Sequence, residues 1–131
     1  MLKKLGRLAT LLLAFSTVLA LPASAATIGW NQNSNGYYYY VNSNGNIMVN
    51  GWINDHGNWY YLDSNGYLLS NGWVNDNGNW YHVDYSGAME TGWVYDSGYW
   101  YYFNTDSTMH TDWLYDGYDW YYFNTNGVWL Y

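Results

Sequence analysis

Residues 72–91 read GWVNDNGNWYHVDYSGAMET, and this stretch decides the fold. Two short runs of aromatic and β-branched residues flank Asp76-Asn77-Gly78, and such runs favour β-strands. Asn-Gly accepts the positive φ that a tight turn requires, so the stretch predicts a β-hairpin. A second turn signal, Asp84-Tyr85-Ser86-Gly87, follows the second run and directs the chain towards the next Gly-Trp pair.

The same pattern occurs five times along the chain. The units span 29–50, 51–71, 72–91, 92–111 and 112–131, each beginning with Gly-Trp except the last, which begins with Asp-Trp. A lone two-stranded hairpin is only marginally stable in water. We therefore predict an all-β solenoid in which successive hairpins stack and bury their aromatic faces against one another. Alternation along a strand places Trp59 and Tyr61 on one face of a hairpin. Tyr60 and Leu62 then lie on the other.

The first 25 residues have the organisation of a secretory signal peptide. Three basic residues lie within 1–7, an apolar run covers 8–21, and Ala23-Ser24-Ala25 forms a small-residue cleavage site after Pro22. The alternative is an uncleaved membrane anchor, but the apolar run is shorter than the roughly 20 residues that a membrane span needs. We therefore expect cleavage after Ala25, secretion, and a mature domain covering 26–131 with no membrane span.

Charge is distributed unevenly along the chain. All three Lys and Arg residues lie within 1–7, so residues 26–131 contain ten acidic side chains and no Lys or Arg. Phosphate contacts and anionic membrane surfaces need cationic side chains, so this distribution argues against nucleic acid and membrane partners. The chain has no cysteine, which excludes disulfides and thiolate zinc sites.

The acidic and histidine side chains do not form a catalytic or metal-binding pattern. Glu90 is the only glutamate and the aspartates recur at predicted turns, whereas glycoside cleavage needs two carboxyl groups facing a shared cleft. Asn75-Asp76-Asn77-Gly78 lacks the glutamate that ends a calcium-binding loop. His56, His82 and His110 occupy three different positions of the repeat. We therefore expect a non-catalytic protein without a cofactor or a metal.

Aromatic residues make up 24 % of the chain, which is more than the core of a thin solenoid requires. One interpretation is that Trp and Tyr only hold neighbouring units together. The other is that they form ligand sites, because aromatic faces attract quaternary ammonium cations and the units contain no Lys or Arg to compete. The surrounding carboxylates would also raise the local concentration of cations.

The repeat resembles the choline-binding, or cell-wall-binding, repeat of Gram-positive bacterial and phage surface proteins. The shared elements are Gly-Trp, Gly-x-Trp-Tyr-Tyr, Asp-Ser-x-Gly and a methionine, and the clearest matches are residues 72–81 and 87–93. The resemblance implies a left-handed solenoid of β-hairpins that binds choline groups of teichoic and lipoteichoic acids. It also implies that aromatic cages lie between successive units.

Each implied cage combines the tryptophan of Gly-Trp, the first aromatic residue of the second cluster, and an aromatic residue of the following hairpin. Carried over by position, cages 1 to 4 are Trp30/Tyr38/Tyr60, Trp52/Trp59/Tyr81, Trp73/Trp80/Tyr101 and Trp93/Trp100/Tyr121. Met48, Met89 and Met109 would flank three of them, and Leu69 the other. Which tyrosine of each cluster faces the ligand stays open at this point.

Two other functions stay open. Related aromatic hairpin repeats occur in glucan-binding proteins, and sugar rings also stack on Trp and Tyr, so a glucan is an alternative ligand. The repeats could instead form a purely structural surface array. The aromatic end at Val128-Trp129-Leu130-Tyr131 would offer a second copy a surface for a homodimer.

Overall fold

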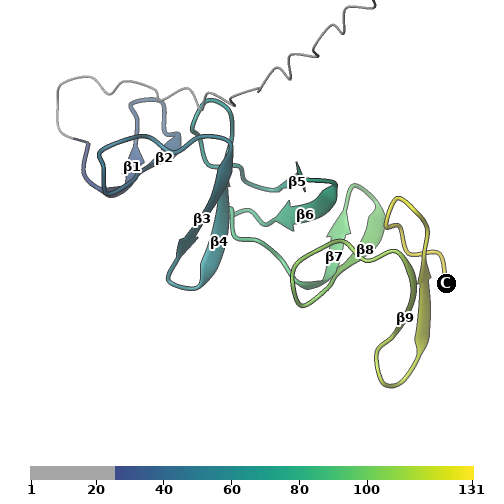
Figure 1. The fold of residues 1–131 in the computed structure, drawn as a ribbon. Helices are drawn as coiled ribbons and strands as arrows, with labels where there is room; N and C mark the ends of the chain where they lie inside the picture. Colours follow the sequence, from purple (N-terminus) through teal and green to yellow (C-terminus); the bar gives the residue numbers. More distant parts are fainter. Residues whose placement is uncertain (1–25) are drawn as a thin grey trace, which may run out of the picture.

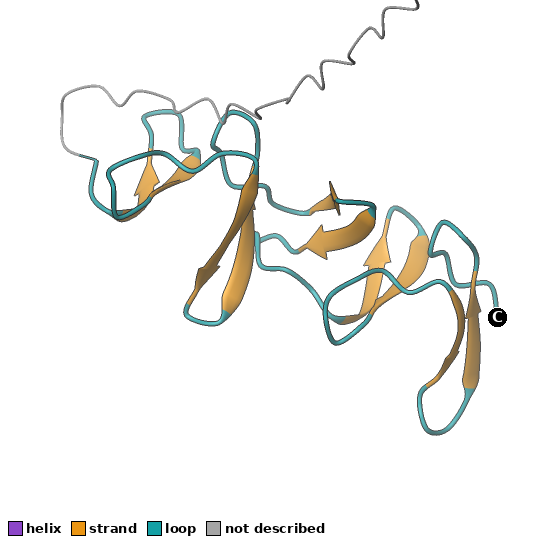
Figure 2. Ribbon diagram, viewed as in Figure 1, coloured by secondary structure: helices purple, strands orange, loops and turns teal. Residues whose placement is uncertain are grey.

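A computed structural model describes residues 26–131 as ten short strands paired in five antiparallel hairpins (Figures 1 and 2). The strands are β1 Gly29–Gln32, β2 Tyr38–Val41, β3 Gly51–Asp55, β4 Asn58–Leu62, β5 Gly72–Asp76, β6 Asn79–Val83, β7 Gly92–Asp96, β8 Tyr99–Phe103, β9 Asp112–Tyr115 and β10 Trp120–Phe123. This architecture confirms the predicted all-β stack. Within residues 26–131 no helix is long and apolar enough to cross a membrane. The predicted signal peptide, residues 1–25, lies outside the described residues.

Each hairpin is a separate two-stranded sheet. The hairpins follow one another in a row from β1–β2 to β9–β10, and neighbouring hairpins point in different directions (Figure 1). Cohesion between units therefore comes from side chains and from the segments that join the hairpins.

The three central hairpins turn through two residues of positive φ. In β5–β6 these are Asn77 and Gly78, with φ of 52° and 86°, and the pair Asp76–Asn79 ends the ladder. Two consecutive positive φ values are typical of a type I′ turn, whose twist matches that of the flanking strands. The tight turn predicted from Asn-Gly is confirmed.

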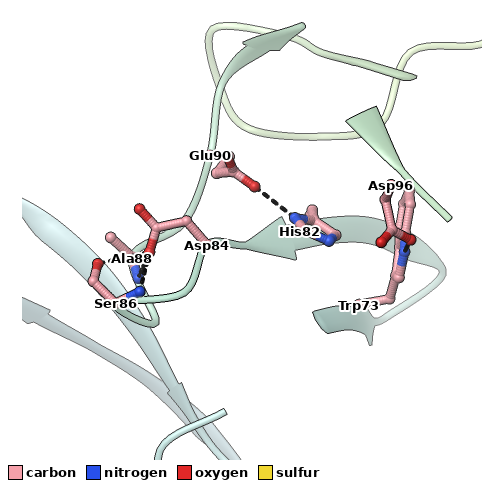
Figure 3. Close-up of polar contacts among 7 residues, drawn as sticks. All are labelled: Trp73, His82, Asp84, Ser86, Ala88, Glu90 and Asp96. Carbon is pink, nitrogen blue, oxygen red and sulfur yellow. Dashed lines mark hydrogen bonds and ion pairs between the residues drawn. The ribbon is translucent and has the colours of Figure 1, made fainter. Parts of the chain in front are cut away.

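The second turn of each unit is organised by a side-chain acceptor. Asp84 Oδ1 accepts hydrogen bonds from the backbone N–H groups of Ser86 and Ala88, at 2.8 and 3.0 Å (Figure 3). Asn42, Asp63 and Asn124 accept equivalent bonds in units 1, 2 and 5. These bonds replace hydration of the backbone N–H groups and fix the direction in which the chain leaves the hairpin.

The segment after this turn ties each unit to the preceding hairpin. The Met89 N–H donates a hydrogen bond of 2.8 Å to the carbonyl of Trp59, which lies in the hairpin of unit 2. The same bond recurs from Leu68, Met109 and Trp129 to Tyr38, Trp80 and Trp100 respectively. Each of these segments therefore brings one side chain, that of the residue whose N–H donates, to the exposed aromatic residue of the preceding unit.

The most completely buried side chains are aliphatic residues and phenylalanine. One column contains the last residue of each second strand, and each member is at most 1 % exposed: Val41, Leu62, Val83, Phe103 and Phe123. Ile53, Val74 and Val94 of the first strands add to it. The aromatic rings of successive hairpins contact one another as expected, but they lie around this column and do not form it. A solenoid this thin buries only one or two apolar side chains in each unit, so most Trp and Tyr rings stay partly exposed around it.

Each hairpin has one face towards the preceding unit and one towards the following unit. Tyr60 packs edge-on against Trp30 of unit 1, with ring centroids 5.3 Å apart. Trp52 of the same hairpin packs against Tyr81 of unit 3 at 5.4 Å, and Tyr61 lies beside Trp52 at 5.0 Å. The predicted alternation of faces along β4 is confirmed.

The C-terminal aromatic residues pack on their own chain. Tyr131 stacks on Tyr122 with centroids 5.4 Å apart and planes 22° apart, and Trp129 contacts Trp93 at 5.7 Å. A homodimer through this end stays a prediction.

Candidate functional site

The structure brings together the predicted walls of the cages. In cage 3, Trp73 is nearly perpendicular to Trp80, with centroids 6.3 Å apart, and to Tyr101, at 4.7 Å. Cage 4 has the same arrangement, with distances of 6.2 and 5.0 Å from its leading tryptophan. In cages 1 and 2 the leading tryptophan contacts the tyrosine of the following hairpin at 5.3 and 5.4 Å. In cages 1 to 4, the tyrosine that contacts the preceding unit is therefore Tyr60, Tyr81, Tyr101 and Tyr121, respectively.

The walls of cages 1, 2 and 3 line open pockets with volumes of about 450, 340 and 370 Å³. These are at the small end of the range for ligand sites. Trp59 and Trp80, the second walls of cages 2 and 3, are 46 % and 43 % exposed. Their faces are therefore available to a small ligand that enters from solvent.

The residue that flanks each cage is set by its distance from the preceding turn. Met89 lines cage 2 and Met109 lines cage 3, as the resemblance implied. In cage 1 this place belongs to Leu68 and not to Leu69. Met48 lines none of these three pockets. The segment between the second turn and the next Gly-Trp or Asp-Trp pair is one residue longer in units 1 and 2 than in units 3 and 4. A position counted back from that pair, as for Met48 and Leu69, therefore lies one residue beyond the position that flanks a cage.

Cage 4 carries a tryptophan where cages 2 and 3 carry methionine. The Trp129 N–H donates to the Trp100 carbonyl at 2.9 Å, in the register of Met109. Its ring contacts Trp93 at 5.7 Å and Tyr121 at 6.3 Å. Cage 4 therefore has a fourth aromatic wall.

Each pocket is completed by a turn that comes from two units further along the chain. Sequence reasoning did not find these residues: Tyr85 and Ser86 in cage 1, Thr105, Asp106 and Ser107 in cage 2, and Thr125 and Asn126 in cage 3. Nothing in a single repeat indicates them, because their proximity depends on how the hairpins rotate along the solenoid.

Aspartates at the end of the first strands orient two of the leading tryptophans. Trp73 Nε1 donates to Asp96 Oδ2 at 2.9 Å, and these two side chains lie side by side in Figure 3. Trp30 Nε1 donates to Asp55 Oδ2 at 3.2 Å in the same way. Each bond fixes the plane of an indole ring and places a carboxylate at the edge of a cage.

The tyrosines of cages 3 and 4 are held in the neutral form. Burial and the negative charge of Asp96 raise the pKa of Tyr101 above its usual value of 10.0. Burial, together with a hydrogen bond to Asp116 and the charges of Asp116 and Asp119, raises the pKa of Tyr121. Both rings therefore keep the uncharged π-face that attracts cations.

The chemistry of these pockets suits a small cation. Their walls are electron-rich faces, carboxylates lie nearby, and residues 26–131 contain no Lys or Arg. Within the same residues, no three His, Asp or Glu side chains lie close enough together to hold a metal ion.

Comparison with known families and structures agrees with this geometry. Residues 50–68 and 111–128 match a family described as a putative cell wall binding repeat, and residues 70–107 match a choline-binding repeat. A comparison with curated protein sequences found no match.

Three solved structures show the same fold. Choline binding protein F from Streptococcus pneumoniae is 36 % identical, with a TM-score of 0.69 over 79 % of this chain and 35 % of its own. The phage Cp-1 endolysin complexed with choline is 34 % identical, with a TM-score of 0.58 over 81 % of this chain and 38 % of its own. The choline binding domain of another Streptococcus pneumoniae protein is 36 % identical, with a TM-score of 0.54 over 66 % of this chain and 98 % of its own.

The chain therefore belongs to the choline-binding repeat family. It spans about a third of the length of choline binding protein F and of the endolysin.

Proposed function

We propose that this chain is a secreted, non-catalytic module that binds choline groups of cell-wall teichoic and lipoteichoic acids through its aromatic cages. The observation that carries the proposal is the recurrence of one arrangement, a leading tryptophan perpendicular to the tyrosine of the following hairpin, at all four junctions between units. Membership of the choline-binding repeat family supports the choice of ligand.

Single cages should bind free choline weakly. A cation–π contact contributes about 0.5–2 kcal/mol. Three contacts, less the cost of immobilising a small ligand, leave about 4 kcal/mol, which corresponds to a dissociation constant of about 1 mM. A polymer with many choline groups can occupy several cages together, and such avidity raises the apparent affinity by about 10²–10⁴. The cages therefore suit a wall polymer better than free choline.

A titration of the purified protein with choline tests the proposal. We expect saturable changes in tryptophan fluorescence and near-ultraviolet circular dichroism at millimolar choline, with an increase in the melting temperature. Trp80→Ala should remove the part of the response that comes from cage 3. Tyr118→Ala, which truncates a ring that is 88 % exposed in the last hairpin loop, should leave the response unchanged.

Two results would overturn the proposal. A response to glucan oligosaccharide with none to choline would assign the cages to sugar rings. No response to either ligand, in a protein that shows the circular dichroism of the folded chain, would indicate a purely structural array.

A further inference from the structure

The cages share their walls but differ in the polar residues that line them. Cage 2 is lined by two carboxylates, Asp76 at the end of β5 and Asp106 in the turn of unit 4. In cage 3, the position of Asp106 is taken by Asn126. The Asp96 carboxylate at the edge of this cage is bonded to the Trp73 indole and does not line the pocket. Cage 1 has Ser86 at that position and one carboxylate, Asp55.

Asp106 is held in place by its own turn. Its Oδ1 atom accepts hydrogen bonds from the backbone N–H and the hydroxyl of Thr108, at 3.0 and 2.6 Å. These bonds lower the pKa of Asp106, so the carboxylate is charged at neutral pH. The bonds use Oδ1, which leaves Oδ2 to interact with a ligand.

Asp76 is also used differently from its counterparts. Asp55 and Asp96 each accept a hydrogen bond from the leading tryptophan of a cage. Asp76 Oδ1 instead accepts a bond of 2.9 Å from the side chain of its neighbour Asn77. Cage 2 therefore presents two carboxylates that are not bonded to an indole.

This difference matters for the kind of ammonium group that a cage accepts. A quaternary ammonium has no N–H, so aromatic faces alone can replace its weakly held water. An ammonium that retains an N–H loses a strong hydrogen bond to water when it enters a cage, and it needs an acceptor inside to compensate. A carboxylate is the strongest acceptor available in a protein for this purpose.

We propose that Asp106, together with Asp76, makes cage 2 accept protonated tertiary amino alcohols as well as quaternary ones, whereas cage 3 discriminates in favour of the quaternary group. The inference rests on the proposed function, because it concerns the selectivity of the same cages. Asp106 is then a residue that determines specificity, and the cages of one chain are not equivalent.

The test compares choline with N,N-dimethylethanolamine at neutral pH, at each cage separately. The indole N–H resonances of Trp59 and Trp80, assigned with single Trp→Phe variants, report on cages 2 and 3. For each cage the measured quantity is the dissociation constant for dimethylethanolamine divided by that for choline. We expect this ratio to be at least about three times smaller at Trp59 than at Trp80.

Reciprocal substitutions at one repeat position provide the controls. Asp106→Asn should raise the ratio at Trp59 towards that at Trp80, and Asn126→Asp should lower the ratio at Trp80. The Oδ1 atom of asparagine can still accept both bonds from Thr108, so the turn should persist. Asn65→Asp adds a carboxylate at the same repeat position but outside the three pockets, and it should change neither ratio.

The outcomes separate the two proposals. If choline shifts neither resonance, the proposed function fails. If choline shifts both resonances, but the ratios are equal and neither reciprocal variant changes them, the proposed function stands and this inference is overturned.

Discussion

Gly78 and Gly87 have almost the same backbone conformation but very different surroundings. Their φ values are 86° and 85°. A Cβ at Gly78 would meet open space, whereas one at Gly87 would lie 2.7 Å from the Leu68 side chain and 2.9 Å from the Leu69 carbonyl. The first glycine is thus required only by a turn, and the second also by the close approach of unit 2.

Alanine substitutions should separate these two requirements. Gly78→Ala should cost about 1–2 kcal/mol of unfolding free energy, which is the penalty for a left-handed non-glycine residue. Gly87→Ala should cost about 1–3 kcal/mol more, because the methyl group overpacks the junction. Urea denaturation of both variants measures the difference. Equal losses would show that the junction relaxes freely.

His82 occupies a buried position where the other units have tyrosine. It is 3 % exposed, its Nδ1 lies 2.5 Å from Glu90 Oε2, and its ring packs edge-on against Trp73 at 5.1 Å (Figure 3). Within residues 26–131, His82 Nε2 has no hydrogen-bond partner. Glu90 is therefore the only group in the described chain that satisfies this buried imidazole.

Removal of the Glu90 carboxylate should leave both ring nitrogens of His82 unsatisfied. We expect Glu90→Ala to lower the unfolding free energy by about 1–3 kcal/mol. His56→Ala is the control, because the His56 side chain is 91 % exposed beside Asp55 and its loss should cost less than about 0.5 kcal/mol. Thermal unfolding at neutral pH compares the two. A loss no larger than that of the control would contradict a structural role for Glu90.

At the scale of the hairpin, the strand-end aspartate links one unit to the cage of the unit before it. Asp96 in β7 accepts the indole N–H of Trp73 in β5, and its charge helps to raise the pKa of Tyr101. Asp96→Ala should release the Trp73 ring and lower the choline affinity of cage 3 by about three- to tenfold, since one hydrogen bond contributes about 0.5–1.5 kcal/mol.

Two measurements check this role of Asp96. Choline titration followed at the Trp80 indole should show the loss of affinity, and ultraviolet titration of the tyrosines should show the pKa of Tyr101 falling. Asp76→Ala changes the same repeat position in a hairpin where this indole bond is not formed, so it should leave cage 3 unaffected. If the two variants weaken cage 3 equally, the bond to Trp73 does not orient the ring.

The hairpins could be predicted from sequence because their determinants are local. The turn at Asn77-Gly78 and the alternation of faces along residues 59–62 each depend on only a few consecutive residues. Both could therefore be predicted directly from the sequence. The cage trios followed from the repeat together with the family resemblance. The flanking residue of cage 1 did not, because a linker one residue longer shifts Leu68 and Leu69 relative to the next Gly-Trp pair. The turns that complete each pocket depend on the rotation of successive hairpins, which no single unit encodes.

At the scale of the whole molecule, stability should depend on the acidic turns that repeat along the solenoid. Burial alone would raise the pKa of Asp84, but hydrogen bonds from Ser86, Ala88 and Gly87 outweigh it and lower the pKa below 3.8. Backbone and side-chain hydrogen bonds also lower the pKa of Asp106 and Asp116. The carboxylate form is thus favoured in the folded chain relative to the unfolded chain.

The sign of the pH dependence follows from this shift. As the pH falls, the unfolded chain takes up protons at these aspartates before the folded chain does, so stability decreases. The contribution is complete above the unfolded pKa of about 4 and disappears as the pH falls through the lower folded value. Protonation also relieves repulsion among the ten acidic side chains, and this opposing effect acts on the whole molecule.

A variant at one turn isolates the local contribution from the global one. Asn42 and Asn124 stand at the position of Asp84 and make the same turn, so Asp84→Asn should keep the fold while it removes the titrating group. The unfolding free energy of the unmodified chain should exceed that of the variant at pH 7. The difference should shrink between pH 4 and pH 2, because repulsion among the other carboxylates is nearly the same in both proteins. A difference that is constant across this range would mean that the charge of Asp84 does not stabilise its turn. The acidic turns would then contribute to the negative charge around the cages and not to stability.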